Sequence, residues 1–311
     1  MAAGEQSSLP LVSVIMNCLN GEKYLREAID SVYAQTYGNW EIIFWDNAST
    51  DQSGEIARGY DGRLRYFRGE ETIPLGAARN EALKRARGEF LAFLDCDDIW
   101  LPEKLAKQIP RFDEARVCLV FCDTYFFSDQ GIIRQLYARR KPPRGQVFRH
   151  LLGDYFLSME TVVIRRRALD ALSEWFDPRF NMIEETDLFL RLAHDGEFDY
   201  VDDPLAKWRV HAASWTFAKK HLFPLEREML LEKFSQLYPG LETAYQSEVD
   251  KIKAKNQYQL GLLEWEQGQP TRVRQRLRPY LATQKRYLVP YFLSFLPYRL
   301  YNRLVEFRNR D

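Results

Sequence analysis

The stretch FLAFLDCDDIWLPEKL, residues 90–105, decides the fold of this chain. Its apolar run over residues 90–94 has the length of a buried strand, and it stops abruptly at Asp95. Asp97 and Asp98 follow at once, so three carboxylates repel one another where the strand ends. Such a cluster either lies in water at the start of a helix or surrounds a cation.

The composition bounds the class of protein. A chain of 311 residues can form one large domain or a domain with a smaller appendage. Its 46% hydrophobic and 28% charged residues are typical of a soluble globular protein. Lys+Arg and Asp+Glu both number 44, but residues 272–311 hold ten basic residues against two acidic ones. A basic tail on an acidic body suggests that the tail meets an anionic surface.

The cysteines and the N-terminus point to the cytoplasm. The cysteines lie in or beside apolar runs and lack zinc-type pairing with histidine, so we expect them to be reduced: Cys18, Cys96, Cys118 and Cys122. The start MAAGEQSSLP lacks the basic region and apolar core of a signal peptide. No run of about 18 apolar residues predicts a simple membrane-spanning helix.

Predicted strands alternate with predicted helices in the first part of the chain. The strands cover residues 11–16, 41–45, 63–67, 90–94 and 117–122. Helical segments separate the first four strands, and a further helix is expected before the last. The alternation predicts an α/β fold with a mostly parallel, Rossmann-like sheet and helices on both faces.

Several polar residues and one glycine are expected to set the ends of these helices. Asn20 can cap the first helix, and Ser49 with Gln52 resembles a capping box for the second. Gly88 is expected at the C-terminus of the helix that precedes the strand 90–94.

The remainder of the chain changes character twice. Residues 128–157 predict an irregular segment, which a short strand and a helix over residues 184–196 follow. Beyond residue 211 the pattern is helical, with two helices joined at residues 268–270. We therefore expect a domain over residues 1–215 and a small helical region with a basic aromatic tail over residues 216–311.

Polar clusters follow three of the predicted parallel strands. These clusters are Asn17 with Asn20, Asp46 with Asn47, and Asp95 with Asp97. In open parallel sheets, ligands bind beyond the carboxyl ends of the strands, which all meet at one edge. The sequence therefore predicts a single polar site at this edge of the sheet.

The segment Asp95-Cys96-Asp97 suits a divalent cation. Neither GxGxxG nor GxxxxGK[ST] occurs, so a phosphate ligand would be held by a metal and by basic side chains. Two carboxylates one residue apart offer hard oxygen ligands to Mg²⁺ or Mn²⁺, which can offset the charge of a leaving diphosphate. The alternative is a solvated acidic loop. The position after a buried strand and before a helix favours the metal site.

Four segments in order resemble one enzyme family. They are VSVIMNCLNGEKYLREAIDSVYAQTYGNWEIIFWDNASTD, GAARNEALKRARGEFLAFLDCDDIWLPEKL, FDPRFNMIEETDLFLRL and KWRVHAAS. Together they resemble family 2 glycosyltransferases with the GT-A fold, over roughly residues 10–215. The resemblance implies transfer of a sugar from a nucleotide donor with inversion at the anomeric carbon.

The resemblance also implies donor-binding residues, carried over position by position. Asp46 and Asn47 would contact the base and the ribose, and Asn17 would lie beneath the base. Arg79 would lie near the donor, and Asp95 would bind the sugar or the metal shell.

Four further positions complete the implied donor site. Asn20 and Arg209 would help to shape the donor pocket, and Asp97 would ligate Mn²⁺ or Mg²⁺. His211 would ligate the metal or donate to the diphosphate, although a lone histidine after a strand is also compatible with an ordinary surface residue. Family members often carry an acid where Asn47 stands. Its amide can accept from N3–H of uracil or donate to another base, so a UDP-sugar is the favoured donor.

An inverting transfer needs one general base to deprotonate the acceptor hydroxyl. The acidic pair of the family corresponds to Glu184 and Glu185, and Glu185 stands where an aspartate is usual. Glu184 and Asp187 share one helical face and are further catalytic candidates. The alternative is that all three only enrich the start of a helix in acid, as the helix dipole favours.

We expect the acceptor to be a glycan or a polyprenyl-linked molecule in surface polysaccharide synthesis. The tail over residues 285–311 mixes aromatic, leucine and basic residues, which suits contact with the inner face of the cell membrane. A terminal helix pair docked on the catalytic domain is the alternative. No nucleic-acid partner is expected. A nucleotidyltransferase and a non-catalytic sugar-nucleotide-binding subunit remain the alternative functions.

Overall fold

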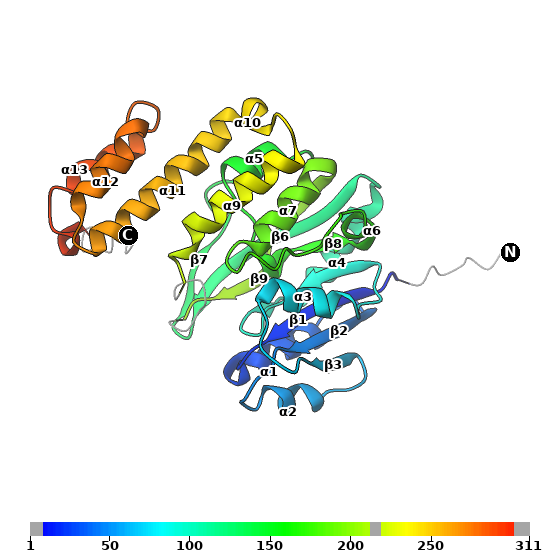
Figure 1. The fold of residues 1–311 in the computed structure, drawn as a ribbon. Helices are drawn as coiled ribbons and strands as arrows, with labels where there is room; N and C mark the ends of the chain where they lie inside the picture. Colours follow the sequence, from blue (N-terminus) through cyan, green and yellow to red (C-terminus); the bar gives the residue numbers. More distant parts are fainter. Residues whose placement is uncertain (1–8, 212–218, 302–311) are drawn as a thin grey trace. The chain divides into compact units, whose positions relative to one another are not determined.

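The computed structural model describes residues 9–211 and 219–301, which form two compact units (Figure 1). The α/β unit comprises residues 1–151 and 155–214, and the helical unit comprises residues 152–154 and 215–311. The predicted boundary at residue 215 falls in the segment 212–218, outside the described residues, and stays a prediction.

The α/β unit is built on a nine-stranded sheet in the order β3-β2-β1-β4-β8-β6-β9-β5, with β7 paired to β6. The strands are β1 Val12–Cys18, β2 Trp40–Asp46, β3 Leu64–Arg68, β4 Phe90–Phe93, β5 Ile99–Trp100, β6 Val117–Ser128, β7 Gly131–Gln135, β8 Val163–Arg165 and β9 Glu197–Arg209. Its helices are α1 Glu22–Tyr33, α2 Ser53–Arg58, α3 Leu75–Leu83, α4 Lys104–Gln108, α6 Arg166–Asp170 and α7 Glu184–Asp195, together with α5 Phe148–Gly153, whose last two residues are assigned to the helical unit.

The predicted parallel sheet is confirmed for the first four long strands. β1 pairs in parallel with β2 and β4, and β2 pairs in parallel with β3. β8 is antiparallel to both β4 and β6, whereas β6 and β9 are parallel. The sheet is therefore parallel where the predicted polar edge lies and mixed beyond it.

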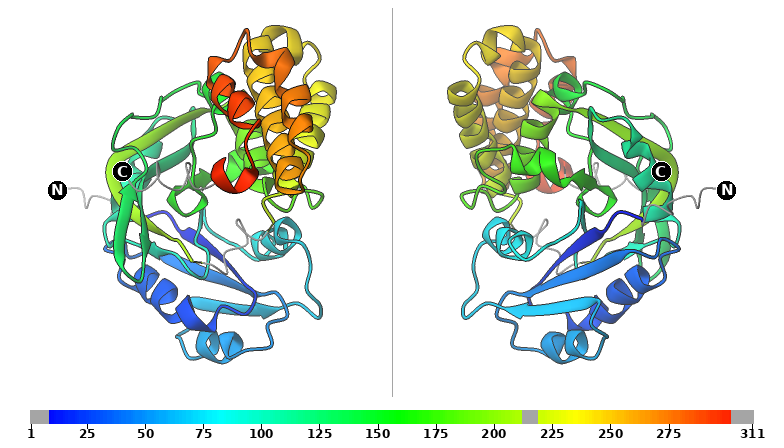
Figure 2. Two further views of the ribbon diagram at one scale, coloured as in Figure 1. Left: turned by 90° about the vertical axis from the view of Figure 1, so that its left-hand side faces the viewer. Right: turned by 90° about the vertical axis from the view of Figure 1, so that its right-hand side faces the viewer.

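Helices cover both faces of the parallel part, as predicted. Leu25 and Ile29 of α1 pack with Val14 and Met16 of β1 in one apolar core. α3 lies on the opposite face of the same strands (Figure 2). Because both faces are covered, every residue of β1, β2 and β4 is buried, which explains their nearly unbroken apolar sequence.

The predicted cap of the first helix is wrong. α1 begins at Glu22 with Gly21 as its N-cap, and Asn20 adopts a left-handed backbone conformation with φ 54°. The Asn20 side chain instead accepts a hydrogen bond of 2.8 Å from the Thr50 N–H. Asn20 therefore joins the loops after β1 and β2 rather than capping a helix.

The predicted capping box of the second helix is also wrong, because partners from the neighbouring loop compete for the same groups. α2 begins after Gln52, and the Ser49 hydroxyl accepts from the Asn20 N–H at 3.0 Å. Asp51 accepts from the Glu22 N–H at 2.9 Å, while Glu22 accepts from the Gln52 N–H at 2.9 Å. Each helix start therefore provides a carboxylate that accepts a hydrogen bond from a backbone N–H group at the start of the other helix.

Gly88 has a different role from the predicted helix terminus. α3 ends at Leu83, five residues earlier. A Cβ at Gly88 would lie 2.5 Å from the Ser13 nitrogen and 2.7 Å from the Leu11 carbonyl oxygen. Glycine is needed because the backbone entering β4 passes this close to β1.

The segment 128–157 is more regular than predicted. β6 continues to Ser128 and forms an antiparallel pair with β7, and α5 follows near the end of the segment. The loop between β7 and α5 is charged and rich in proline, and it dominates the sequence pattern of this segment, so neither element was predicted.

The helical unit contains α9 Leu222–Leu237, α10 Leu241–Ala244, α11 Gln246–Glu266, α12 Pro270–Leu277 and α13 Leu288–Leu293. The predicted joint at residues 268–270 is confirmed, with Gly268 at φ 83°. Trp265, Tyr287 and Tyr301 are buried together in the core of this unit. Among the described residues, no helix has the length and apolar character needed to cross a membrane.

Candidate active site

The carboxyl ends of β2, β1 and β4 lie side by side and carry the three predicted polar clusters. The loops after β1 and β2 are tied together, because the Asn47 N–H donates to the Cys18 carbonyl at 2.8 Å. The polar residues that the sequence placed after separate strands therefore share one edge of the sheet.

Asp46 is fully buried at this edge and is held as a charged group. Its carboxylate accepts from the Tyr66 hydroxyl at 2.6 Å, from Arg68 at 2.5 Å and from the Ser49 N–H at 2.7 Å. Burial alone would raise the pKa of Asp46, but these hydrogen bonds outweigh it and lower the pKa below its ordinary value. Asp46 thus organises the loop, and its predicted contact with the donor stays a prediction.

Asn47 and Asn17 are buried beside Asp46. The Asn47 amide donates to the Ile73 carbonyl at 2.8 Å and accepts from the Ile73 N–H at 3.2 Å, which fixes its orientation. The Asn17 amide nitrogen is buried and makes no hydrogen bond to any other residue that the structure describes. Both residues lie where the sequence predicted, although a base that is read by the Asn47 side chain would have to displace Ile73.

Arg79 joins the two halves of the predicted site. Its guanidinium donates to Glu184 at 2.5 Å and to Asp95 at 3.1 Å, and the residue is only 3% exposed. Burial opposes the charge, but the Asp95 and Glu184 carboxylates outweigh it and raise the pKa of Arg79. One buried cation therefore positions the donor-side segment against the start of α7.

Glu185 lies beside Glu184 at the start of α7. It is half-buried, and no ion pair to another described residue involves it. Burial and then the neighbouring Glu184 charge raise its pKa to about 8, against the opposing effect of Arg79. A carboxyl group with a pKa near neutrality can accept and release a proton during turnover.

Asp187, the third acidic candidate, has a structural partner. Its carboxylate accepts two hydrogen bonds from Arg191, one turn later in α7, at 2.7 and 3.1 Å. Arg191 also donates to the Glu174 carbonyl at 2.6 Å. This pairing favours a role for Asp187 in anchoring α7 over the predicted catalytic role.

Asp97 and His211 meet across the sheet edge, 114 residues apart in sequence. The His211 Nε2 lies 2.8 Å from the Asp97 Oδ2, and both side chains are partly exposed. Burial and then the Asp95 charge raise the pKa of Asp97, while His211 opposes the rise. Because a carboxylate oxygen and an imidazole nitrogen both suit Mn²⁺, these two residues fit a cation that would relieve the repulsion between the carboxylates.

Asp98 and Arg209 belong to the frame of the site. The buried Asp98 carboxyl accepts from the Arg209 N–H at 2.8 Å, and burial raises its pKa well above the ordinary range. The Arg209 side chain donates to the Asp97 carbonyl at 2.8 Å and to Glu27 at 2.5 Å, and stacks on the Tyr24 ring at 4.2 Å. Arg209 is 5% exposed and supports the segment that carries Asp97, and its predicted place in the donor pocket stays a prediction.

Three further residues line this edge and were not predicted as site residues from the sequence: Tyr24, Tyr66 and Arg68. Tyr66 and Arg68 are two residues apart in β3, so their side chains lie on the same face of the sheet. Because β3 follows the strand that carries Asp46, this spacing could have predicted that they lie near Asp46. No local signal distinguishes Tyr24, whose ring lies 5.3 Å from that of His211, from other apolar positions of α1.

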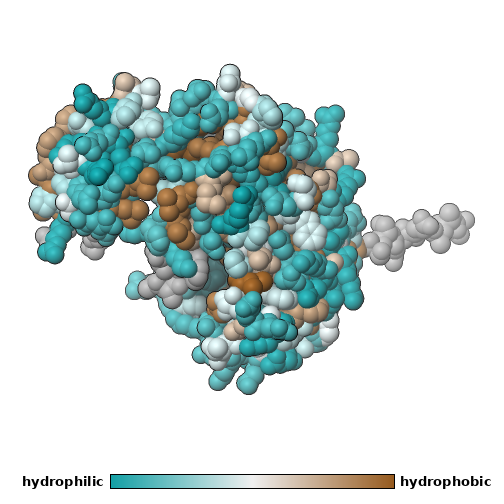
Figure 3. Space-filling view, viewed as in Figure 1, coloured by the Kyte–Doolittle hydropathy of each residue, from teal (hydrophilic) through white to brown (hydrophobic). Residues whose placement is uncertain are grey.

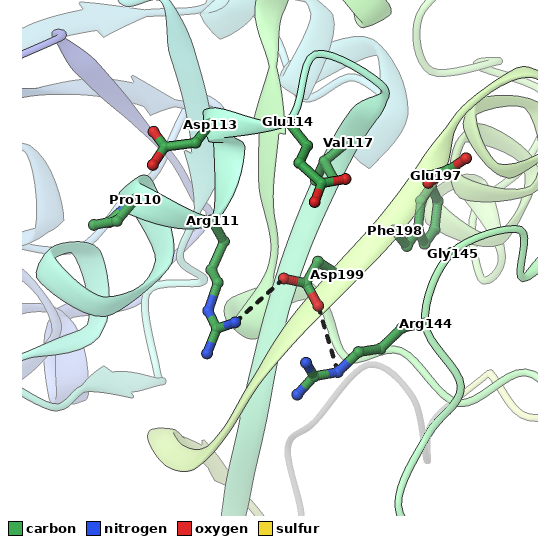
Figure 4. A pocket seen from close by; sticks show the side chains of 10 residues that line it. All are labelled: Pro110, Arg111, Asp113, Glu114, Val117, Arg144, Gly145, Glu197, Phe198 and Asp199. Carbon is green, nitrogen blue, oxygen red and sulfur yellow. Dashed lines mark ion pairs between the residues drawn. The ribbon is translucent and has the colours of Figure 1, made fainter.

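Two other features carry no comparable site. Glu174, Asp177 and Asp187 bring carboxylate oxygens within 4.8 Å of one another, but Arg179 and Arg191 already pair with two of them. A cavity of about 400 Å³ lies at the starts of β6 and β9, away from the edge that holds the polar clusters. There, two arginines converge on Asp199 (Figure 4).

The fold is the GT-A fold of solved glycosyltransferases. The S. aureus TarS fragment 1–349 in complex with UDP-GlcNAc superimposes with a TM-score of 0.60 at 18% identity, covering 93% of this chain and 91% of that fragment. The mannosyltransferase PcManGT of Pyrobaculum calidifontis, with GDP-Man and Mn²⁺, also gives 0.60 at 18% identity, covering 95% of this chain and 84% of that enzyme.

Sequence relatives define the family. The model of glycosyl transferase family 2 matches residues 13–173. An uncharacterized glycosyltransferase of Methanocaldococcus jannaschii is 31% identical over 65% of this chain and 71% of its own length. The E. coli enzyme WfgD, a UDP-Glc:alpha-D-GlcNAc-diphosphoundecaprenol beta-1,3-glucosyltransferase, is 32% identical over 59% of this chain and 69% of its own. The chain belongs to glycosyl transferase family 2 and is a glycosyltransferase, which disfavours the two alternative functions.

Proposed function

We propose that this glycosyltransferase moves a sugar from a nucleotide diphosphate, with UDP favoured, to a hydroxyl of a glycan or lipid-linked acceptor, with inversion. The observation that carries the proposal is the Arg79 bridge between Asp95 and Glu184, residues 89 apart in sequence. This bridge supports a single site that contains the Asp95 carboxylate and the start of α7. Donor and acceptor chemistry can then take place on opposite sides of one sugar ring.

Glu185 is the proposed general base. Its pKa of about 8 is set by burial and by Glu184, so its basicity is well above that of an ordinary carboxylate. A base of this strength can take the proton of the acceptor hydroxyl as the hydroxyl oxygen attacks the anomeric carbon. Glu184 holds Arg79 and affects the reaction indirectly, because its charge raises the pKa of Glu185.

Asp97 and His211 are the proposed ligands of Mn²⁺ or Mg²⁺. Such an ion would offset the negative charge of the departing diphosphate. Arg209 holds the backbone of Asp97 through its carbonyl, and Asp98 holds the backbone of Arg209. These contacts preorganise the ligand segment before a donor binds.

The names of the relatives support a role in surface polysaccharide synthesis. WfgD is named for a lipid-diphosphate-linked acceptor, and the B. subtilis relative TuaG, 29% identical over 69% of this chain, for teichuronic acid biosynthesis. We propose an acceptor of the same kind, and a place of work in the cytoplasm at the inner face of the membrane.

Turnover of a panel of nucleotide sugars by the full chain tests this function. UDP release with Mn²⁺ is expected from wild type, with loss of about 10²-fold or more in Asp97→Ala and in Glu185→Gln. Asp113→Asn, an exposed acid near the opposite edge, should keep full activity. Donor binding, followed by thermal shift, should survive in Glu185→Gln and weaken in Asp97→Ala. Equal turnover in all four proteins would remove both residues from the mechanism.

We further propose that the basic aromatic tail contacts an anionic lipid surface. Val289, Phe292 and Phe295 are 60, 63 and 66% exposed, and the exposed Lys285 and Arg286 precede them. Hydrophobic residues interrupt the hydrophilic surface where α13 lies (Figure 3). Exposed aromatic residues beside basic ones suit shallow insertion between charged headgroups. Residues 302–311 of the tail lie outside the described residues.

The test replaces exposed residues only, because deletion of residues 285–311 would remove the buried Tyr287 and Tyr301. Phe292→Ser with Phe295→Ser should abolish salt-sensitive binding to vesicles that contain an anionic lipid. Ile132→Ser, an equally exposed apolar position in β7, is the matched control and should bind as wild type does. Unchanged binding of the double variant would end the proposal.

A further inference from the structure

Two thiols face each other at the edge that holds the proposed donor site. Cys18 is the last residue of β1, and Cys96 lies between Asp95 and Asp97. β1 and β4 are parallel neighbours with Ile15 opposite Phe93, and Cys96 lies in the turn that follows β4. Adjacent strands lie about 4.8 Å apart, so residues at their ends can meet the Cα separation of about 4.4–6.8 Å that a disulfide requires.

Both sulfur atoms lie beside Gly21, at the start of α1. A Cβ at Gly21 would lie 2.8 Å from the Cys18 sulfur and 2.8 Å from the Cys96 sulfur. Both sulfurs therefore occupy the small space that the missing side chain of Gly21 leaves open. Both thiols are free, so no disulfide joins Cys18 and Cys96 in this structure.

The surroundings favour the thiolate at Cys18. Hydrogen bonding from the Cys96 thiol, followed by that from Ser53 and the Gly21 N–H, lowers the pKa of Cys18 despite its burial. Cys118 and Cys122 are different, because burial raises the pKa of each to about 12 and each thiol lies 3.7 Å from a backbone carbonyl.

We propose that Cys18 and Cys96 form a reversible disulfide that switches the donor site off, with a peroxide as the oxidant. One thiolate attacks a peroxide oxygen, the O–O bond breaks, and the released hydroxide takes up a proton to leave as water. The second thiol then attacks the sulfenic acid, the S–S bond forms, and a second water leaves. Two thiols are oxidised, one hydrogen peroxide is reduced to two waters, and a dithiol reductant restores the thiols.

Bond formation would act on the proposed metal-binding segment, and this consequence rests on the proposed function. An S–S bond of about 2.05 Å draws Cys96 toward β1. Asp95 and Asp97 on either side are held at 3.1 Å by Arg79 and at 2.8 Å by His211. A displacement of about 1 Å in such a segment can reduce turnover about 10²-fold.

The first test measures the bond itself in the full chain. Hydrogen peroxide should give a species lighter by two hydrogens in wild type, and peptide mapping should place the link between Cys18 and Cys96. Cys118→Ser should behave as wild type does, whereas Cys18→Ser and Cys96→Ser should form no such link. A wild-type protein that keeps both thiols, or that links other cysteines instead, overturns the proposal.

The second test measures the consequence. The rate of UDP release from a sugar donor should fall about 10²-fold when the wild-type protein is oxidised. The thermal shift that UDP with Mn²⁺ produces should become smaller. Both should recover with dithiothreitol. Cys96→Ser should resist the oxidant. Full activity in the linked protein would refute the switch. Absence of turnover in the reduced protein would instead refute the proposed function, while the mass measurement would still decide whether the bond forms.

Discussion

Glu185→Gln gives the sharpest test of how the site is built. Burial and Glu184 raise the pKa of Glu185 to about 8, from an ordinary value of 4.5. If the ionised form is the base, kcat/KM of wild type should rise with pH and level off above an apparent pKa near 8. The variant has no such base, so it should lose about 10²–10⁴-fold in rate together with this pH dependence.

The same pKa predicts the pH dependence of stability. The native state holds the Glu185 proton more tightly than the unfolded chain does, so between pH 4.5 and about 8 the native state carries more protons. The free energy of unfolding therefore decreases as the pH rises through this window, by up to about 5 kcal/mol at about 1.4 kcal/mol per unit. Glu185→Gln should lack this decrease and be more stable than wild type at pH 9.

Chemical denaturation between pH 5 and 9 and initial rates over the same range measure both effects. Glu184→Gln is the informative control, because it removes the neighbouring negative charge and should move the rate inflection to lower pH. An inflection in wild type near the ordinary glutamate pKa, or one that persists in Glu185→Gln, would refute the reasoning.

Two further predictions concern the framework of the site. Arg79→Met removes the cation that pairs with the buried Glu184 carboxylate, so it should lower the free energy of unfolding in denaturant by about 3–5 kcal/mol. Adding Glu184→Met should restore most of this free energy. A decrease below about 1 kcal/mol in the single variant would contradict the buried bridge. Gly88→Ala should destabilise by about 1–3 kcal/mol, because its Cβ would lie 2.5 Å from the Ser13 nitrogen. Gly62→Ala, where nothing lies within 4 Å of the added atom, is the control, and equal stability of the two variants would refute the close approach.

Local pattern was sufficient for the parallel half of the fold. Buried strands read as unbroken apolar runs, and the acidic segment at Asp95 followed one of them, because these signals depend only on residues close together in the chain. The helix caps at Asn20 and Ser49 were predicted wrongly because they depend on residues that are distant in the chain. Their hydrogen-bond partners come from a neighbouring loop about 30 residues away, and that loop is near only after folding.

The sequence by itself determined which residues stand at the strand ends and therefore what chemistry is available there. Only the tertiary structure decided which of these groups are charged, paired or left to act. Arg79 meets Glu184 across 105 residues, and burial together with the Glu184 charge raises the pKa of Glu185. Burial and the distances between charges control such pKa values, and both quantities exist only once distant segments have packed together.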